Sequence, residues 1–147
     1  MSGGPAARLL RATTIVVDEG PFVMAAWPGS QASAVHIGLL RAAKRPYFVA
    51  DDDLETTAFL HETSLRGLPP PRQAEHGFCV LTLDMVMAWD VVGVLAAITA
   101  VLAEAGVPVG ALTAFSRDHV LVPRNKLTTA LDALRPLCKE VTTRGRH

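Results

Sequence analysis

The chain has 147 residues, of which 50% are hydrophobic and 19% are charged, and its formal net charge is zero. This length suits one domain of ordinary size or two small ones, and the composition predicts a packed core instead of a disordered chain. Zero net charge argues against a general nucleic-acid binder, and it leaves little electrostatic repulsion between copies of the chain.

No uninterrupted apolar stretch reaches the about 18 residues of a membrane-spanning helix, so no membrane partner is expected. Residues 1–11 contain Arg8 and Arg11 but no long apolar segment, and we interpret them as a flexible tail instead of a signal peptide. Cys79 and Cys138 lie far apart in the sequence, which favours two free thiols over a disulfide or a metal pair. These features predict a cytoplasmic protein.

The N-terminal half begins with two apolar runs, at residues 12–17 and 22–27. The intervening Asp18-Glu19-Gly20-Pro21 is typical of a turn, so the runs form either a hairpin or one strand broken by a bend. Apolar residues at helical spacing then predict a helix over residues 30–44, with Ser30 or Ser33 as its N-cap.

After Pro46, residues 47–50 and 55–60 predict two strands around the Asp51-Asp52-Asp53 turn. The stretch at 65–76, LRGLPPPRQAEH, is rich in proline and predicts a linker. We therefore expect an N-terminal module at 12–64 and a C-terminal module at 77–143.

The C-terminal half predicts the order β-α-β-β-α. A strand at 77–83 precedes an alanine-rich helix that begins at Asp90 and stops at Gly106. A strand after Pro108, a turn at Arg117-Asp118 and a strand at 119–122 follow, and Asn125 is expected to cap the last helix. A short strand is also possible at 140–143. The two halves share a loose order of elements, so a duplication is a hypothesis about topology alone.

Several polar groups invite a catalytic or metal interpretation, and the sequence favours none of them. The three aspartates at 51–53 are adjacent, and a turn explains them better than a metal site. His61-Glu62 lacks the second histidine of a zinc protease helix, since position 65 is leucine. Asp118 and His119 are neighbours on a strand and point to opposite faces, so they do not form a triad with Ser116. No cofactor or metal is therefore expected, and the protein is predicted not to be an enzyme.

The stretch that begins DVVGVL at Asp90, continues through LAEAGVPV at residues 102–109 and ends in TAFSRDHVLVP at residues 113–123 resembles the ACT domain family. Its second part is similar to the small tandem ACT proteins related to the CASTOR-type amino-acid sensors. The resemblance covers about half of the chain well, and the N-terminal half only in outline. It implies an α+β fold of two ferredoxin-like βαββαβ modules, with antiparallel sheets, helices on one face and strands exchanged between the modules.

The resemblance also implies a regulatory protein that binds a small molecule, usually an amino acid, at an interface between ACT modules. The implied ligand-binding residues lie in a loop, at the helix start after it and in the later strand-turn-strand: Asp90, Val91, Val92, Gly93, Val94, Ala114, Phe115 and Asp118. A helix start suits a carboxylate, Gly93 allows close approach, and Asp118 suits an ammonium group. Arginine sensors of this type carry a carboxylate directly after the aspartate. Val91 and Val92 here favour an aliphatic or aromatic amino acid instead.

Structural roles compete with each of these assignments. Asp90 serves equally well as an N-cap, Gly93 as a close helix–sheet contact and Asp118 as a turn residue, and Phe115 belongs to a core as often as to a ligand site. The alternative function is an ACT-fold dimerisation or interaction module without a ligand. We expect a homodimer, and the output of a chain of this size passes through self-association or an unidentified protein partner.

Overall fold

The computed structural model describes residues 4–85, 88 and 90–145. The chain divides into two compact units, of which one comprises Met1–Glu19 with Cys79–His147 and the other Gly20–Phe78. We call the first the terminal unit, because it holds both chain ends, and the second the middle unit. Two long strands, β1 (Thr14–Pro28) and β4 (Gln73–Asp84), each contribute residues to both units.

In the middle unit the second part of β1 is followed by a 3-10 turn, η1 (Gly29–Gln31), and a helix, α2 (Ala32–Ala42). Two antiparallel strands come next, β2 (Phe48–Asp51) and β3 (Glu55–His61), and η2 (Glu62–Gly67) leads to β4. The strand order is β2-β3-β1-β4, with β3 antiparallel to β1.

Alternate residues of β1 and β3 form one face of the middle unit's sheet, because successive side chains of a strand point to opposite faces. Val23, Ala25 and Trp27 on that face pack with Val35 and Leu39 of α2 in one hydrophobic cluster. The indole Nε1 of Trp27 donates a hydrogen bond to the carbonyl of Pro69 at 2.8 Å. The proline-rich segment is thereby attached to the core.

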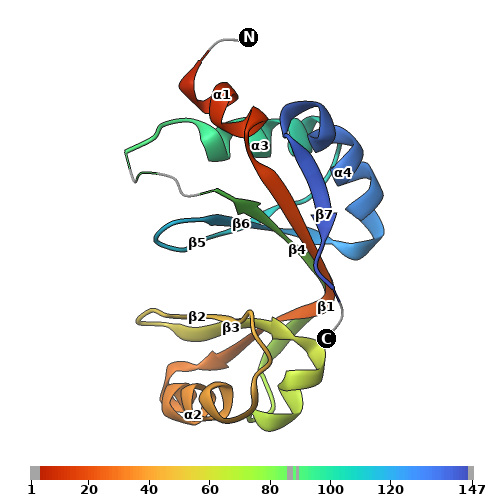
Figure 1. Ribbon diagram of the computed structural model, residues 1–147. Coiled ribbons are helices and arrows are strands. Elements are labelled where there is room, and N and C mark those ends of the chain that lie inside the picture. The colour runs from red at the N-terminus through yellow and green to blue at the C-terminus, as the bar shows by residue number, and fades with distance from the viewer. Residues whose placement is uncertain (1–3, 86–87, 89, 146–147) are drawn as a thin grey trace. The chain divides into compact units, whose positions relative to one another are not determined.

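The helices of the terminal unit pack on its part of the sheet (Figure 1). Its helices are α1 (Pro5–Arg11), α3 (Val94–Glu104), α4 (Leu127–Leu134) and the 3-10 turns η3 (Arg124–Lys126) and η4 (Arg135–Leu137) that flank α4. Its further strands are β5 (Gly110–Thr113), β6 (Asp118–Pro123) and β7 (Glu140–Thr143), in the order β7-β1-β4-β6-β5. β5 and β6 are antiparallel, whereas β7 runs parallel to β1.

The core of the terminal unit joins the helices to one face of this sheet. Leu81, Leu83, Val120 and Val122 of the strands are buried together with Ile98 of α3. The predicted α+β class, a mostly antiparallel sheet with helices, is therefore confirmed, and its order of elements is that of an ACT-like or ferredoxin-like fold. Within the described residues, no helix is both long and apolar enough to span a membrane.

Of the two alternatives for residues 12–27, a hairpin or a single strand, the structure has the single strand, because β1 continues through the predicted turn. Two other local predictions differ from the structure. Part of the predicted tail forms α1, whose Leu10 is buried in the core. The predicted linker at 65–76 contains the end of η2 and the start of β4. Pairing with β3 and β7 keeps β1 extended through its turn-like sequence, and burial of Leu10 attaches α1 to the core.

The three predicted helix caps were also wrong. Gln31 and Lys126 precede α2 and α4, because a 3-10 turn stands where Ser30 and Asn125 were expected to begin each helix. Gly93, not Asp90, precedes α3, and no side chain caps that helix.

Candidate functional site

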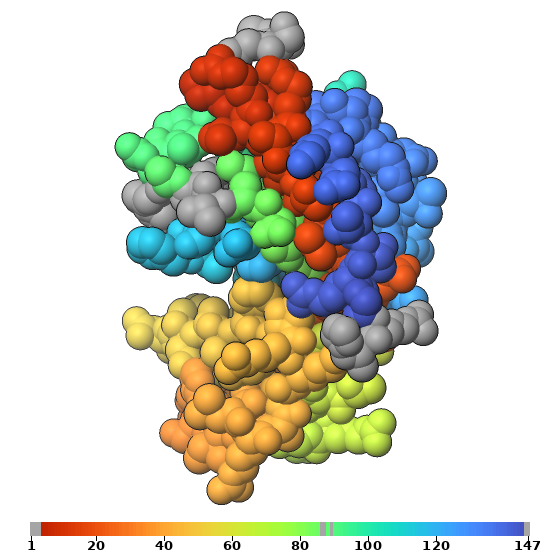
Figure 2. Space-filling model, viewed as in Figure 1, coloured from red at the N-terminus to blue at the C-terminus, as the bar shows by residue number. Residues whose placement is uncertain are grey.

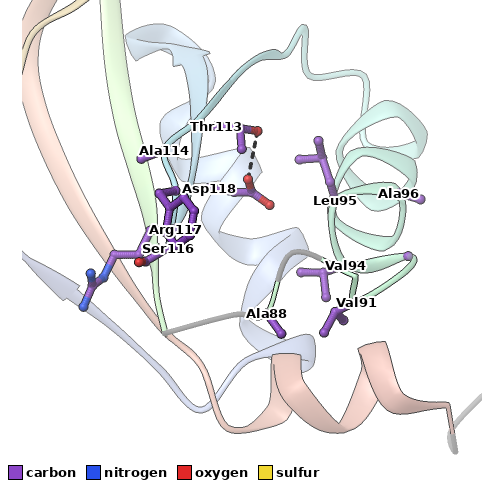
Figure 3. Close-up of a pocket in the computed structure, with 12 residues that line it drawn as sticks. Ala88, Val91, Val94, Leu95, Ala96, Thr113, Ala114, Ser116, Arg117 and Asp118 are labelled. Carbon is purple, nitrogen blue, oxygen red and sulfur yellow. Dashed lines mark hydrogen bonds between the residues drawn. The ribbon is translucent and has the colours of Figure 1, made fainter.

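A cavity of about 280 Å³ lies in the terminal unit between the start of α3 and the turn that joins β5 to β6 (Figure 3). This size approaches the lower end of the about 300–1,000 Å³ that is usual for small-molecule sites. The lining is mostly apolar and includes one buried carboxylate. Its residues are Ala88, Val91, Gly93, Val94, Leu95, Ala96, Thr113, Ala114, Phe115, Ser116, Arg117 and Asp118.

The start of α3 forms one wall of the cavity. Gly93 has a φ of +96°, in the left-handed region where a side chain is strained, and its carbonyl accepts the first helical hydrogen bond from the Ala97 amide at 3.0 Å. The amides of Val94, Leu95 and Ala96 lie within the first turn, where an α-helix provides no acceptor. Within the described residues no side chain caps them, so this wall presents unpaired N–H donors and the positive end of the helix dipole.

Asp118 belongs to the opposite wall. Its side chain is only 6% exposed and points toward α3 in Figure 3. It lies directly across the hairpin from Thr113, whose hydroxyl donates a hydrogen bond to its Oδ1 at 3.0 Å. Within the described residues Asp118 forms no ion pair, so a largely buried carboxylate lines the cavity.

The turn itself forms the rim. The ring of Phe115 is 93% exposed, and Val92, which does not line the cavity, is 86% exposed. Arg117 points away from the cavity in Figure 3, and its Nε donates a hydrogen bond to Oδ1 of Asp84 at 2.9 Å. Its charge is therefore directed to β4, and the rim toward solvent is apolar.

Six of the eight residues predicted to bind a ligand line this cavity, namely Val91, Gly93, Val94, Ala114, Phe115 and Asp118; Asp90 and Val92 do not. The sequence reasoning missed Leu95 and Ala96 on the helix and Thr113, Ser116 and Arg117 on the hairpin. Thr113 was within reach of prediction, because a hairpin of this length places it opposite Asp118. Trp89, which precedes Asp90 in the sequence, lies outside the described residues.

Other polar groups have structural roles. His119 faces away from Asp118 and its Nδ1 lies 2.9 Å from the Thr82 hydroxyl, while burial and then the nearby Arg144 lower the pKa of its ring. Cys79 and Cys138 are free, and burial raises the pKa of Cys79 to about 11, so its thiol is unreactive at neutral pH. The described residues include no group of three or more metal ligands.

Residues 73–136 match the family described as ACT domain. No curated protein matches the chain. Among solved structures, a protein from Agobacterium tumefaciens is similar with a TM-score of 0.72 at 17% identity, covering 92% of this chain and 96% of its own. A Vibrio cholerae protein of unknown function has a TM-score of 0.64 at 21% identity, covering 91% of this chain and 94% of its own.

The regulatory subunit of aspartate kinase from Thermus thermophilus, in its ligand-free form, has a TM-score of 0.65 at 14% identity, covering 87% of this chain and 97% of its own. Identities this low establish a shared fold and no more. The ACT-family match contains β4, α3, β5, β6 and α4, and hence the hairpin and the helix start that line the cavity.

Proposed function

We propose that this protein is a non-catalytic regulatory module that binds an amino acid in the cavity of the terminal unit. The observation that carries the proposal is the pairing of two opposite groups across one small apolar cavity. The unpaired amides at the start of α3 form one wall, and the buried carboxylate of Asp118 forms part of the other. An amino acid has the complementary pair, a carboxylate and an ammonium group.

In this proposal the ligand's α-carboxylate accepts hydrogen bonds from the amides of Val94, Leu95 and Ala96, as anions do at helix starts. The α-ammonium group donates to Asp118, whose Thr113 hydrogen bond holds the carboxylate in place. The ligand's side chain lies against Val91 and Phe115. Because the rim is apolar and Arg117 is engaged with Asp84, an aliphatic or aromatic side chain fits better than a charged one.

The fold supports a regulatory role within this proposal. We infer that the two units are a pair of ferredoxin-like ACT modules that exchange strands, since β1 and β4 each contribute to both. The ACT match over residues 73–136 and the fold shared with a kinase regulatory subunit favour ligand sensing over chemistry. A second ACT module that covers the exposed Phe115 would complete the site, as the resemblance implies.

A thermal-shift screen against the twenty amino acids tests the proposal, since a ligand that binds only the native state raises the unfolding temperature with its concentration. We expect a saturable rise with aliphatic or aromatic amino acids. Asp118→Asn should remove most of that rise, because it removes the buried negative charge to which the ligand's ammonium group donates. Asp132→Asn, on an exposed position of α4 in the same unit, is the matched control and should respond as the parent does.

A flat response to all twenty amino acids would overturn the proposal and leave the dimerisation module as the better account. An undiminished rise in Asp118→Asn would place the ligand elsewhere.

A further inference from the structure

One side of α2 in the middle unit carries large apolar residues that no element of that unit covers. Leu40 is 79% exposed and Ile37 is 49% exposed, and Ala34 continues the stripe at helical spacing. The opposite side of the same helix buries Val35 and Leu39 in the core. We call the exposed stripe of Ala34, Ile37 and Leu40 the α2 outer face. The segment that contains α2, in orange in Figure 2, reaches the surface of the middle unit.

Charges of opposite sign flank this face. Arg41, Lys44 and Arg45 are all exposed at the C-terminal end of α2. The acidic turn at 51–53 is exposed too, and it lies beside the first half of the helix, because Oδ2 of Asp51 is 2.6 Å from Nε2 of His36. The tip of the same turn carries Leu54, which is 82% exposed. Acidic charge therefore lies beside the first half of α2, and basic charge lies at its C-terminal end.

We propose that two copies of this chain associate through the α2 outer face, with their α2 helices antiparallel across a two-fold axis. A surface whose charge changes sign along a helix is complementary to its own copy only when that copy is reversed. The two-fold axis then sets the basic end of each copy against the acidic turn of the other, at both ends at once. The apolar stripes meet in the middle and leave water.

The proposed surface is small. A helix of 11 residues is about 16 Å long at about 1.5 Å per residue, whereas a stable interface buries about 800 Å² on each partner. The association is therefore weak and sensitive to salt, since exposed charges are screened within about 8 Å at physiological ionic strength. This dimer is separate from the ligand cavity and does not depend on amino-acid binding.

Sedimentation velocity of the full chain over a range of concentrations, at low and at high salt, tests the proposal. We expect the parent chain to associate reversibly and more tightly at low salt. Leu40→Glu should weaken association at least tenfold. Unfolding temperatures should stay unchanged, because position 40 is already exposed. Val92→Glu introduces the same charge at an exposed apolar position of the terminal unit, and it separates this surface from the rim of the cavity.

An experiment that reverses the charges on each side of the proposed interface provides a sharper test. Arg41→Glu with Lys44→Glu makes both ends acidic, and Asp53→Lys makes the turn less acidic, so each variant alone should associate more weakly than the parent. An equimolar mixture of the two should associate more tightly than either alone. Asp53 is the chosen position because Asp51 and Asp52 hold the turn through hydrogen bonds.

Three results would overturn the proposal. The first is a chain that stays monomeric at millimolar concentration, which would leave the face to a different protein. The second is association that Val92→Glu weakens and Leu40→Glu does not. The third is a mixture of the charge variants that associates no better than its components.

Discussion

Both units place a helix beside the turn end of a β-hairpin, and in both the cross-strand pair next to the turn is an aspartate and a threonine. In the middle unit Asp51 faces Thr56, whose hydroxyl donates to Oδ1 of Asp51 at 2.7 Å. In the terminal unit Thr113 faces Asp118 and donates to it at 3.0 Å. The order of the two residues is reversed between the units. The aspartate stands on the first strand of the hairpin in the middle unit and on the second strand in the terminal unit.

The two hairpins differ in the helix residue that lies opposite the carboxylate. In the middle unit His36 of α2 takes the second oxygen of Asp51, and the Thr56 hydrogen bond followed by the His36 hydrogen bond lowers the pKa of Asp51. In the terminal unit the side chains of α3 at the corresponding wall are apolar, and a cavity lies between the helix and the carboxylate. One arrangement thus gives a half-exposed hydrogen-bonded pair, and the other gives a cavity lined by a largely buried carboxylate.

The largest expected effect on stability is that of a substitution at Gly38, which tests how closely α2 packs in the middle unit. A Cβ at this position would lie 2.7 Å from the backbone carbonyl of Gly67 and 3.3 Å from Leu68. Gly38→Ala should therefore destabilise the middle unit by about 2 kcal/mol, the range of an overpacked core. Gly29→Ala, where nothing lies within 4 Å, is the control.

Urea denaturation measures both glycine variants. If Gly38→Ala is as stable as Gly29→Ala, α2 does not pack as closely on η2 as described. The response to amino acids should persist in both variants, because neither position lines the cavity.

The next prediction gives the hairpin of the terminal unit the kind of histidine partner that Asp51 has in the middle unit, which should remove the difference between the two. Leu95 lies on α3 near Asp118 in Figure 3, so Leu95→His introduces a partner like His36 and should close the cavity. Amino-acid binding should weaken at least tenfold, which is about 1.4 kcal/mol of binding free energy. Leu95→Met keeps an apolar side chain of similar volume and should bind as the parent does, by isothermal titration calorimetry. Equal affinities in the two variants would contradict the account.

The smallest effect concerns pH. Burial holds the pKa of His119 below its ordinary value of 6.5, so between these two pKa values the unfolded chain binds the proton that the folded chain refuses. The free energy of unfolding should therefore fall as pH drops below about 6.5. His119→Gln, which keeps a partner for Thr82, should make that fall shallower. Urea denaturation from pH 8 to pH 5 measures both slopes, and parallel curves would argue against a role for His119.

The sequence predicted the parts of this site that depend on local pattern. Hydrophobic periodicity located the strands at 77–83 and 119–122 and the helix between them, and the resemblance to the ACT family assigned Gly93, Val94 and Asp118 to one ligand site. Their contacts with a ligand remain a proposal. The residue that closes the other hairpin was not predicted, because the approach of His36 to Asp51 depends on how α2 packs, and no spacing in the chain encodes it.

Turn-like composition misled the prediction elsewhere. Asp18-Glu19-Gly20-Pro21 has every local mark of a turn, yet β1 passes through it because partners on both sides supply ladder hydrogen bonds: β3 along residues 22–28 and β7 along residues 14–17. Long-range pairing of this kind outweighs local propensity and cannot be read from one segment.

The most direct test of the central claim is a ¹⁵N-resolved NMR titration with the amino acid that gives the largest thermal shift. The account predicts saturable shifts of the amides at 94–96 and in the turn at 113–118, and no saturable shifts in the matching hairpin at 51–56. Shifts centred on residues 51–56, or binding that leaves the amides at 94–96 unmoved, would contradict the claim that the start of α3 and Asp118 form the ligand site.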